Sequence, residues 1–185
     1  MKPRIHIDGS AYYITNVIYG RLPIFIRSSF IIPLIDSLNF YRYQHQFRLI
    51  GYVFMPDHIH LILWPEKESF VGNFMRDFKR FTSGRICRQA SLESKNDWVE
   101  AFEKVGKQTS RAEYKVWQDS FWEEVVFTEK FLYQKLDYIH MNPVRAGLVD
   151  EPQKYPYSSY RNYELEDDSL LEIDRDWLSA LESAD

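Results

Sequence analysis

The chain has 185 residues, of which 45% are hydrophobic and 17% aromatic, as is typical of a single folded domain. A single cysteine, Cys87, excludes an internal disulfide framework and a cysteine-rich zinc site, and favours a reducing, cytoplasmic location. Residues 164–185 carry nine acidic side chains and one basic side chain, whereas the rest carries 18 acidic and 22 basic ones. The body is therefore mildly basic and compatible with a polyanionic partner, and no apolar run is long enough to cross a membrane.

The hydrophobic pattern divides the chain into short alternating strands and longer helices. In chain order it predicts a strand at 11–18, a helix at 30–44, strands at 47–54 and from His58, a helix at 69–88, strand-like segments at 114–118 and 121–126, and a helix from Thr128 to about Asn142. Pro143 is expected to end that last helix. Residues 90–113 lack clear periodicity and are interpreted as an insertion, with at most a short helix near 98–105.

This order of elements indicates the fold class. A βαββαβ order predicts an α+β, ferredoxin-like or RRM-like antiparallel sheet with helices on one face, followed by a C-terminal helix and tail. The other face of the sheet is expected to stay open. We predict one domain at 1–163, with the insertion at about 90–113, and an acidic C-terminal tail at 164–185.

Two histidines lie at the start of the strand that follows the Met55-Pro56-Asp57 turn. Because side chains alternate along a strand, His58 and His60 share one face, while Ile59 and its aliphatic neighbours share the other. Two neutral imidazoles that point the same way can converge on one cation. Taken alone, however, a His-x-His pair favours half-exposed histidines of an ordinary sheet.

A tyrosine and an amide one helical turn apart complete the candidate site. Tyr138 and Asn142 lie on one face of the last predicted helix, because residues four apart are neighbours on a helix. Two imidazoles and a side-chain oxygen can hold a divalent ion that polarises a phosphodiester, and a tyrosine hydroxyl can then attack phosphorus. The alternatives are that Tyr138 is a core residue, or that Tyr133 or Tyr114 is the nucleophile.

These segments resemble a known family. His58-Ile59-His60 is similar to the His-hydrophobe-His motif of HUH nucleases, and the segment 138–149, Tyr-Ile-His-Met-Asn-Pro-Val-Arg-Ala-Gly-Leu-Val, resembles the tyrosine segment of single-tyrosine transposases. Further similarity at 51–57 and 116–122 points more narrowly to the REP-associated tyrosine transposases. The resemblance covers most of residues 11–160.

The resemblance implies a mechanism and a set of roles. It implies an enzyme, a transposase-like endonuclease and strand-transferase for single-stranded DNA near hairpins, which uses Mg²⁺ or Mn²⁺ and forms a 5′-phosphotyrosine. Tyr138 would be the nucleophile. His58, His60 and Asn142 would contact the metal. Relatives act as monomers or as homodimers, so the resemblance leaves the oligomeric state open.

Three basic residues are candidate DNA-backbone contacts: Arg21, Lys79 and Arg80. The alternative for the two on the 69–88 helix is an ordinary solvated face. Two other functions stay open at this stage. One is a domesticated DNA-hairpin-binding protein with little or no transposition activity. The other, a histidine-triad nucleotide hydrolase, is disfavoured because its third histidine would stand where the chain has Ile62.

Overall fold

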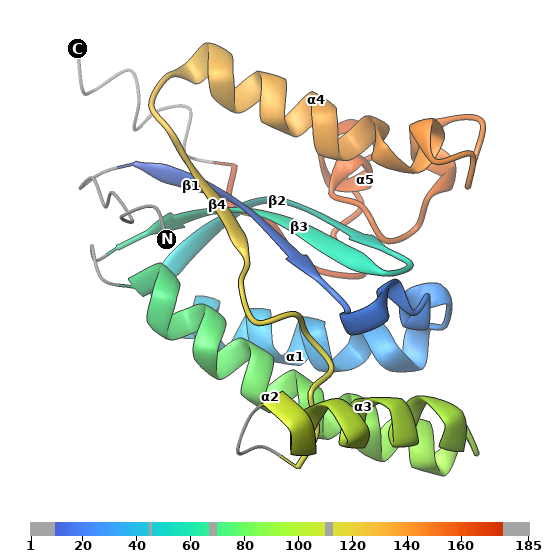
Figure 1. Cartoon of the computed structure of the whole chain (residues 1–185). Helices are drawn as coiled ribbons and strands as arrows, with labels where there is room; N and C mark the ends of the chain where they lie inside the picture. Colours follow the sequence, from blue (N-terminus) through green and yellow to red (C-terminus); the bar gives the residue numbers. More distant parts are fainter. Residues whose placement is uncertain (1–9, 45, 67–69, 110–112, 176–185) are drawn as a thin grey trace.

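Four antiparallel strands form the centre of the protein (Figure 1). The structure, a computed structural model, describes residues 10–44, 46–66, 70–109 and 113–175. The strands are β1 (Ala11–Val17), β2 (Phe47–Met55), β3 (His58–Pro65) and β4 (Trp122–Val126). Their order is β2-β3-β1-β4, and each neighbouring pair is antiparallel. This is the strand order of a ferredoxin-like sheet, so the predicted fold class is confirmed.

Helices α1 (Ser28–Tyr43) and α2 (Phe70–Leu92) cover one face of this sheet (Figure 1). Ile59, Leu61 and Leu63 of β3 are fully buried in the core on that side, as their alternation predicted. Phe74 and Phe78 of α2 lie in the same core. A third helix, α3 (Asn96–Thr109), packs on α2 and buries Phe102. It is longer than the short helix expected within 90–113, because its apolar side chains recur on one face.

The expectation of an open second face is wrong. Helix α4 (Glu129–Arg145) lies across that face (Figure 1). There Ile50, Val53 and Met55 of β2 are buried in a second core, to which α4 contributes Leu132, Leu136 and Ile139. The physical reason lies in β2, whose run of apolar residues leaves both faces of the strand in need of cover. The second face is therefore closed over β2.

Gly51 allows α4 to approach the sheet closely. The β2–β3 register is irregular between Leu49 and Gly51, which places a bulge under the helix. A Cβ atom at position 51 would lie 2.7 Å from Leu136 Cδ2 and 3.1 Å from Ile139 Cδ1. A side chain at position 51 would therefore force the Leu136 and Ile139 side chains to shift.

The end of α4 differs from the prediction. Pro143 lies within the helix, which continues to Arg145. Gly147, with φ of +69°, then ends it: its N–H donates to Val144 O, and the Leu148 N–H donates to Pro143 O. This pair of bonds is a Schellman cap. Pro143 has no N–H to donate to the carbonyl one turn earlier, yet its own carbonyl accepts one of the two capping bonds.

The remaining segments join the strands and helices. Residues 114–118 do not form a strand; an isolated bridge joins Trp117 to Ile18. Short 3₁₀ turns lie at Tyr19–Arg21, Ile24–Ile26 and Pro152–Lys154, and a short helix, α5, at Tyr160–Glu164. No helix in the described ranges combines the length and apolar character that a membrane crossing needs.

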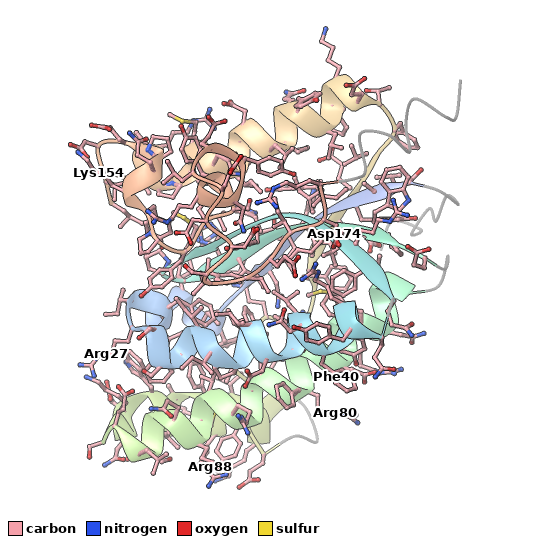
Figure 2. All side chains as sticks on the ribbon, turned by 180° about the vertical axis from the view of Figure 1, so that it is seen from behind. Arg27, Phe40, Arg80, Arg88, Lys154 and Asp174 are labelled. Carbon is pink, nitrogen blue, oxygen red and sulfur yellow. The ribbon has the colours of Figure 1, made fainter. Side chains whose placement is uncertain are left out.

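The first part of the predicted acidic tail is folded onto the body. Leu171 and Ile173 are buried in the α1–α2 core. The Asp174 carboxylate (labelled in Figure 2) accepts two hydrogen bonds from Arg42, each of 3.1 Å, and one from the Leu49 N–H. Residues 176–185 lie outside the described residues. The division of the chain at 163/164 stays a prediction.

We expect Gly51→Val to lower the free energy of unfolding by about 1–3 kcal/mol, because the added methyl groups overpack the contact between β2 and α4. Gly84→Ala is the matched control. A Cβ atom at Gly84 in α2 meets nothing within 4 Å, so this change should stabilise by about 0.5–1 kcal/mol. Urea unfolding measures both. Equal effects of the two substitutions would contradict the close approach at Gly51.

Candidate active site

Strand β3 presents the two histidines side by side on the α4 face of the sheet. In the β1–β3 register His60 lies opposite Thr15, and His58 lies opposite Val17. The ring centroids of His58 and His60 are 4.9 Å apart, with the rings nearly perpendicular. The predicted sharing of one face is thus found.

His60 is buried, with 4% of its surface exposed. Its Nδ1 atom lies 2.7 Å from the Tyr13 hydroxyl and 2.8 Å from Thr15 Oγ1. Its Nε2 atom is buried and has no hydrogen-bond partner in the described structure. Burial, with smaller contributions from the nearby charges of His58 and Lys135, lowers the pKa of His60 to about 3. At neutral pH the imidazole is therefore uncharged, and with Nδ1–H donating to a hydroxyl its Nε2 lone pair is available to a ligand.

His58 is oriented by a carboxylate. Its Nδ1 atom lies 2.5 Å from Asp57 Oδ1, and the other oxygen of Asp57 accepts a 3.1 Å bond from Arg21. Burial raises the pKa of Asp57, but the hydrogen bonds and charges of His58 and Arg21 outweigh it and hold the pKa below its usual value. Asp57 is therefore ionised at neutral pH and holds His58 through Nδ1. Carboxylates in this position orient metal-binding histidines in other proteins.

Helix α4 brings Tyr138 to the histidines. The Tyr138 side chain is 41% exposed, and its ring centroid lies 5.7 Å from that of His60 and 6.2 Å from that of Tyr13, both in edge-to-face contacts. An open cavity of about 400 Å³ adjoins these rings. Its lining residues are Tyr13, Thr15, Val17, Arg21, His58, His60, Trp122, Glu124, Lys135 and Tyr138. A single chain therefore supplies both histidines and the tyrosine.

Two proteins of known name are similar to this chain in sequence. No family model matches the chain. A Haemophilus influenzae protein with the provisional name REP-associated tyrosine transposase is 28% identical over 160 residues, or 82% of this chain and 80% of that protein. The REP-associated tyrosine transposase of Escherichia coli is 24% identical over 116 residues, or 62% of this chain and 54% of that protein.

A solved structure extends the similarity to the fold. The structure of a REP-associated tyrosine transposase bound to a REP hairpin superposes with a TM-score of 0.66 at 20% identity, covering 94% of this chain and 89% of that one. This chain is a homologue of the REP-associated tyrosine transposases. The predicted resemblance is confirmed.

In this transposase homologue Asn142 lies apart from the cavity. It is one turn beyond Tyr138 on α4, and its amide nitrogen lies 3.4 Å from the Tyr138 carbonyl oxygen, to which it donates. It is not among the cavity-lining residues. The sequence spacing correctly placed Asn142 one turn from Tyr138 on the helix. The metal contact predicted for Asn142 stays a prediction.

The alternative residues weighed from the sequence also lie elsewhere. Tyr133 and Tyr114 do not line the cavity that holds the histidines, and Tyr114 lines a separate cavity beside α2. His140 points away from Tyr138, with its Nε2 atom 2.9 Å from Ser159 Oγ and its ring against Tyr160. His140 therefore has a packing role, and Tyr138 is the tyrosine that meets the histidines.

The three candidate DNA contacts divide between the two sides of the sheet. Arg21 lines the cavity of the transposase homologue. Lys79 and Arg80 belong to α2 on the opposite side, where Figure 2 labels Arg80. The Lys79 ammonium donates to the backbone oxygens of Gln118, Asp119 and Ser120, at 2.9–3.3 Å. Lys79 therefore holds the loop before β4, while Arg80 is largely exposed and pairs with Asp77.

Sequence reasoning missed six lining residues: Tyr13, Thr15, Val17, Trp122, Glu124 and Lys135. The sequence predicts which face of its strand or helix each of these residues occupies. It does not give the strand register that sets Thr15 opposite His60. Lys135 and Glu124 form a 2.6 Å ion pair between α4 and β4. The Lys135 ammonium also lies 4.5 Å from the centre of the Tyr13 ring. This pair joins the helix that carries Tyr138 to the edge strand.

We expect Thr128→Ala to cost about 0.5–2 kcal/mol of stability. Thr128 is the N-cap of α4, and its hydroxyl accepts a 3.2 Å hydrogen bond from the Phe131 N–H. Thr128→Ser keeps the hydroxyl and should cost much less. Chemical denaturation of the two variants compares them directly, and an Ala variant as stable as wild type would show that the cap contributes nothing.

Proposed function

We propose that this chain is a metal-dependent endonuclease and strand-transferase for single-stranded DNA, acting through Tyr138 and a covalent 5′-phosphotyrosine. One observation carries the proposal: the Tyr138 ring lies 5.7 Å from that of His60, whose Nε2 atom is buried without a hydrogen-bond partner. A buried, unsatisfied nitrogen is costly unless a ligand completes it. Homology to proteins named REP-associated tyrosine transposases supports the same reaction class.

His58 and His60 fit a divalent cation. Both Nδ1 atoms are engaged, by Asp57 and by the hydroxyls of Tyr13 and Thr15, which leaves both Nε2 atoms for a ligand. Mg²⁺ or Mn²⁺ bound there would polarise the scissile phosphodiester as a Lewis acid. Asn142 is the third contact implied by the family resemblance. It is the least supported of the three, because its side chain bonds within its own helix.

The chain's own residues then carry the transfer. The Tyr138 oxygen forms a bond to phosphorus as the bond from phosphorus to the 3′ oxygen of the preceding nucleotide breaks. The phenol proton passes to solvent, and the released 3′ oxygen takes up a proton. Because one phosphodiester replaces another, a 3′ hydroxyl can reverse the step and rejoin strands.

The cavity suits a DNA strand as the substrate. It is open, it contains a half-exposed tyrosine, and Arg21 at its wall supplies a cation for a backbone phosphate. The solved relative is bound to a REP hairpin. We therefore propose a hairpin-bearing single strand as the partner of this chain. Both histidines and the tyrosine come from one polypeptide, so the proposal holds for a monomer and for a homodimer.

Incubation with Mn²⁺ and a labelled pool of hairpin oligonucleotides with randomised single-stranded flanks should give a protein–DNA adduct that survives denaturing electrophoresis. Tyr138→Phe should abolish the adduct, because it removes the nucleophilic oxygen. Tyr133→Phe is the matched control on the same helix and should retain it. Hairpin binding without an adduct in the wild type would instead favour the domesticated DNA-binding protein.

Mn²⁺ at saturating concentration should raise the melting midpoint by about 5–10 °C, because a ligand that binds only the folded state stabilises it. The joint change of His58 and His60 to Ala should remove this increase. Asn142→Ala should reduce it only if Asn142 contacts the metal. His140→Gln, outside the cavity, should preserve the increase even if it lowers the starting midpoint. Differential scanning fluorimetry measures all four proteins, and an unchanged wild-type midpoint argues against the metal site.

A further inference from the structure

An exposed tryptophan stands at the edge of the candidate active site. Trp122 begins β4, lines the cavity and is 62% exposed. Its indole is the largest apolar side chain in the cavity wall, and exposing it to water is unfavourable. Trp122 has no role in the proposed metal site or in the proposed attack by Tyr138.

The sheet register ties Trp122 to His60. Trp122 lies opposite Thr15, and Thr15 lies opposite His60, so the three residues form one row across β4, β1 and β3. Directly opposed residues project to the same face of a sheet. Two strand spacings separate Trp122 from His60, or about 10 Å between Cα atoms. A nucleotide bound with its phosphate between His60 and Tyr138 would therefore have its base within reach of the indole.

A lysine of α2, on the other side of the sheet, fixes the backbone that precedes Trp122. Lys79 of α2 donates to three consecutive carbonyls at 118–120, directly before β4. The Gln118 N–H donates to Val17 O, which ties the same loop to the end of β1. The indole is thus presented by a loop fixed at several points. A backbone that is already ordered loses little entropy when a ligand stacks on the side chain that it carries.

We propose that Trp122 is a nucleobase-stacking subsite beside the scissile phosphate, an inference that rests on the proposed single-strand DNA function. Stacking on an aromatic side chain tolerates any base, because every base has a π face. The subsite would therefore fix how far the strand advances past Tyr138, without reading its sequence. It adds a positioning contact at a residue that the family resemblance did not assign.

Binding can be measured without cleavage. The parent protein is the full chain with Tyr138→Phe, kept in chelator, and the probe is a fluorescent hairpin with an oligo-dT flank. Each flank nucleotide is replaced in turn by an abasic unit, and Kd is measured by anisotropy. The parent should lose roughly 5- to 100-fold in affinity when one particular base is removed, the size of one stacking contact.

The same scan is then made on two variants of Trp122. Trp122→Leu should weaken the intact probe by a similar factor and lose all sensitivity to that abasic position, because the two changes remove the same contact. Trp122→Phe should retain part of both. Phe40→Leu is the matched control: Phe40 is 58% exposed on α1, on the far side of the sheet (Figure 2). It should behave as the parent.

The outcomes separate the subsite from the proposed function. A Trp122→Leu variant that keeps the abasic sensitivity of the parent overturns the stacking subsite, whatever its overall affinity. A parent that binds no oligonucleotide, with a wild type that forms no adduct, overturns the subsite together with the proposed function. Wild-type adduct formation with an unchanged Trp122 scan leaves the function standing and removes the subsite alone.

Discussion

The close packing of α4 on β2 is the constraint on which the site depends. Gly51 leaves room for the Leu136 and Ile139 side chains where the helix meets the strand. Its apolar face then closes the second core with Ile50 and Val53. The same packing turns Tyr138 toward His60, so a contact made for stability also brings together residues far apart in the chain. The packing of the helix therefore also sets the position of Tyr138.

The polar residues beneath Tyr138 oppose that stability. Burying His60 in a strand costs free energy, and its Nε2 atom remains without a hydrogen-bond partner among the described residues. The Tyr13 and Thr15 hydroxyls satisfy Nδ1 and so restrict the ring to one orientation. A neutral imidazole held this way is poorly suited to a core but well suited to a ligand. A buried polar group that lowers stability but is well placed for a ligand is typical of functional sites.

Charged residues around the cavity are mostly paired. Lys135 binds Glu124, and Arg21 binds Asp57, which itself contacts His58. Arg145, at the end of α4, lies 5.5 Å from the centre of the Tyr138 ring. One ion pair links α4 to β4, and the other links the turn after β1 to the turn before β3. Both lie at the opening of the cavity.

Local sequence alone determined the strands, most of the helices and the two faces of β3. His58 and His60 could be assigned to one face and Ile59 and Leu61 to the other, because successive side chains of an extended backbone point to opposite faces. Only the tertiary structure decided the rest. Register set Thr15 opposite His60 and Trp122 in the same row, and packing covered the second face. Neither Lys79 nor Asn142 lines the cavity. Those outcomes depend on contacts between distant segments, which no local pattern of residues encodes.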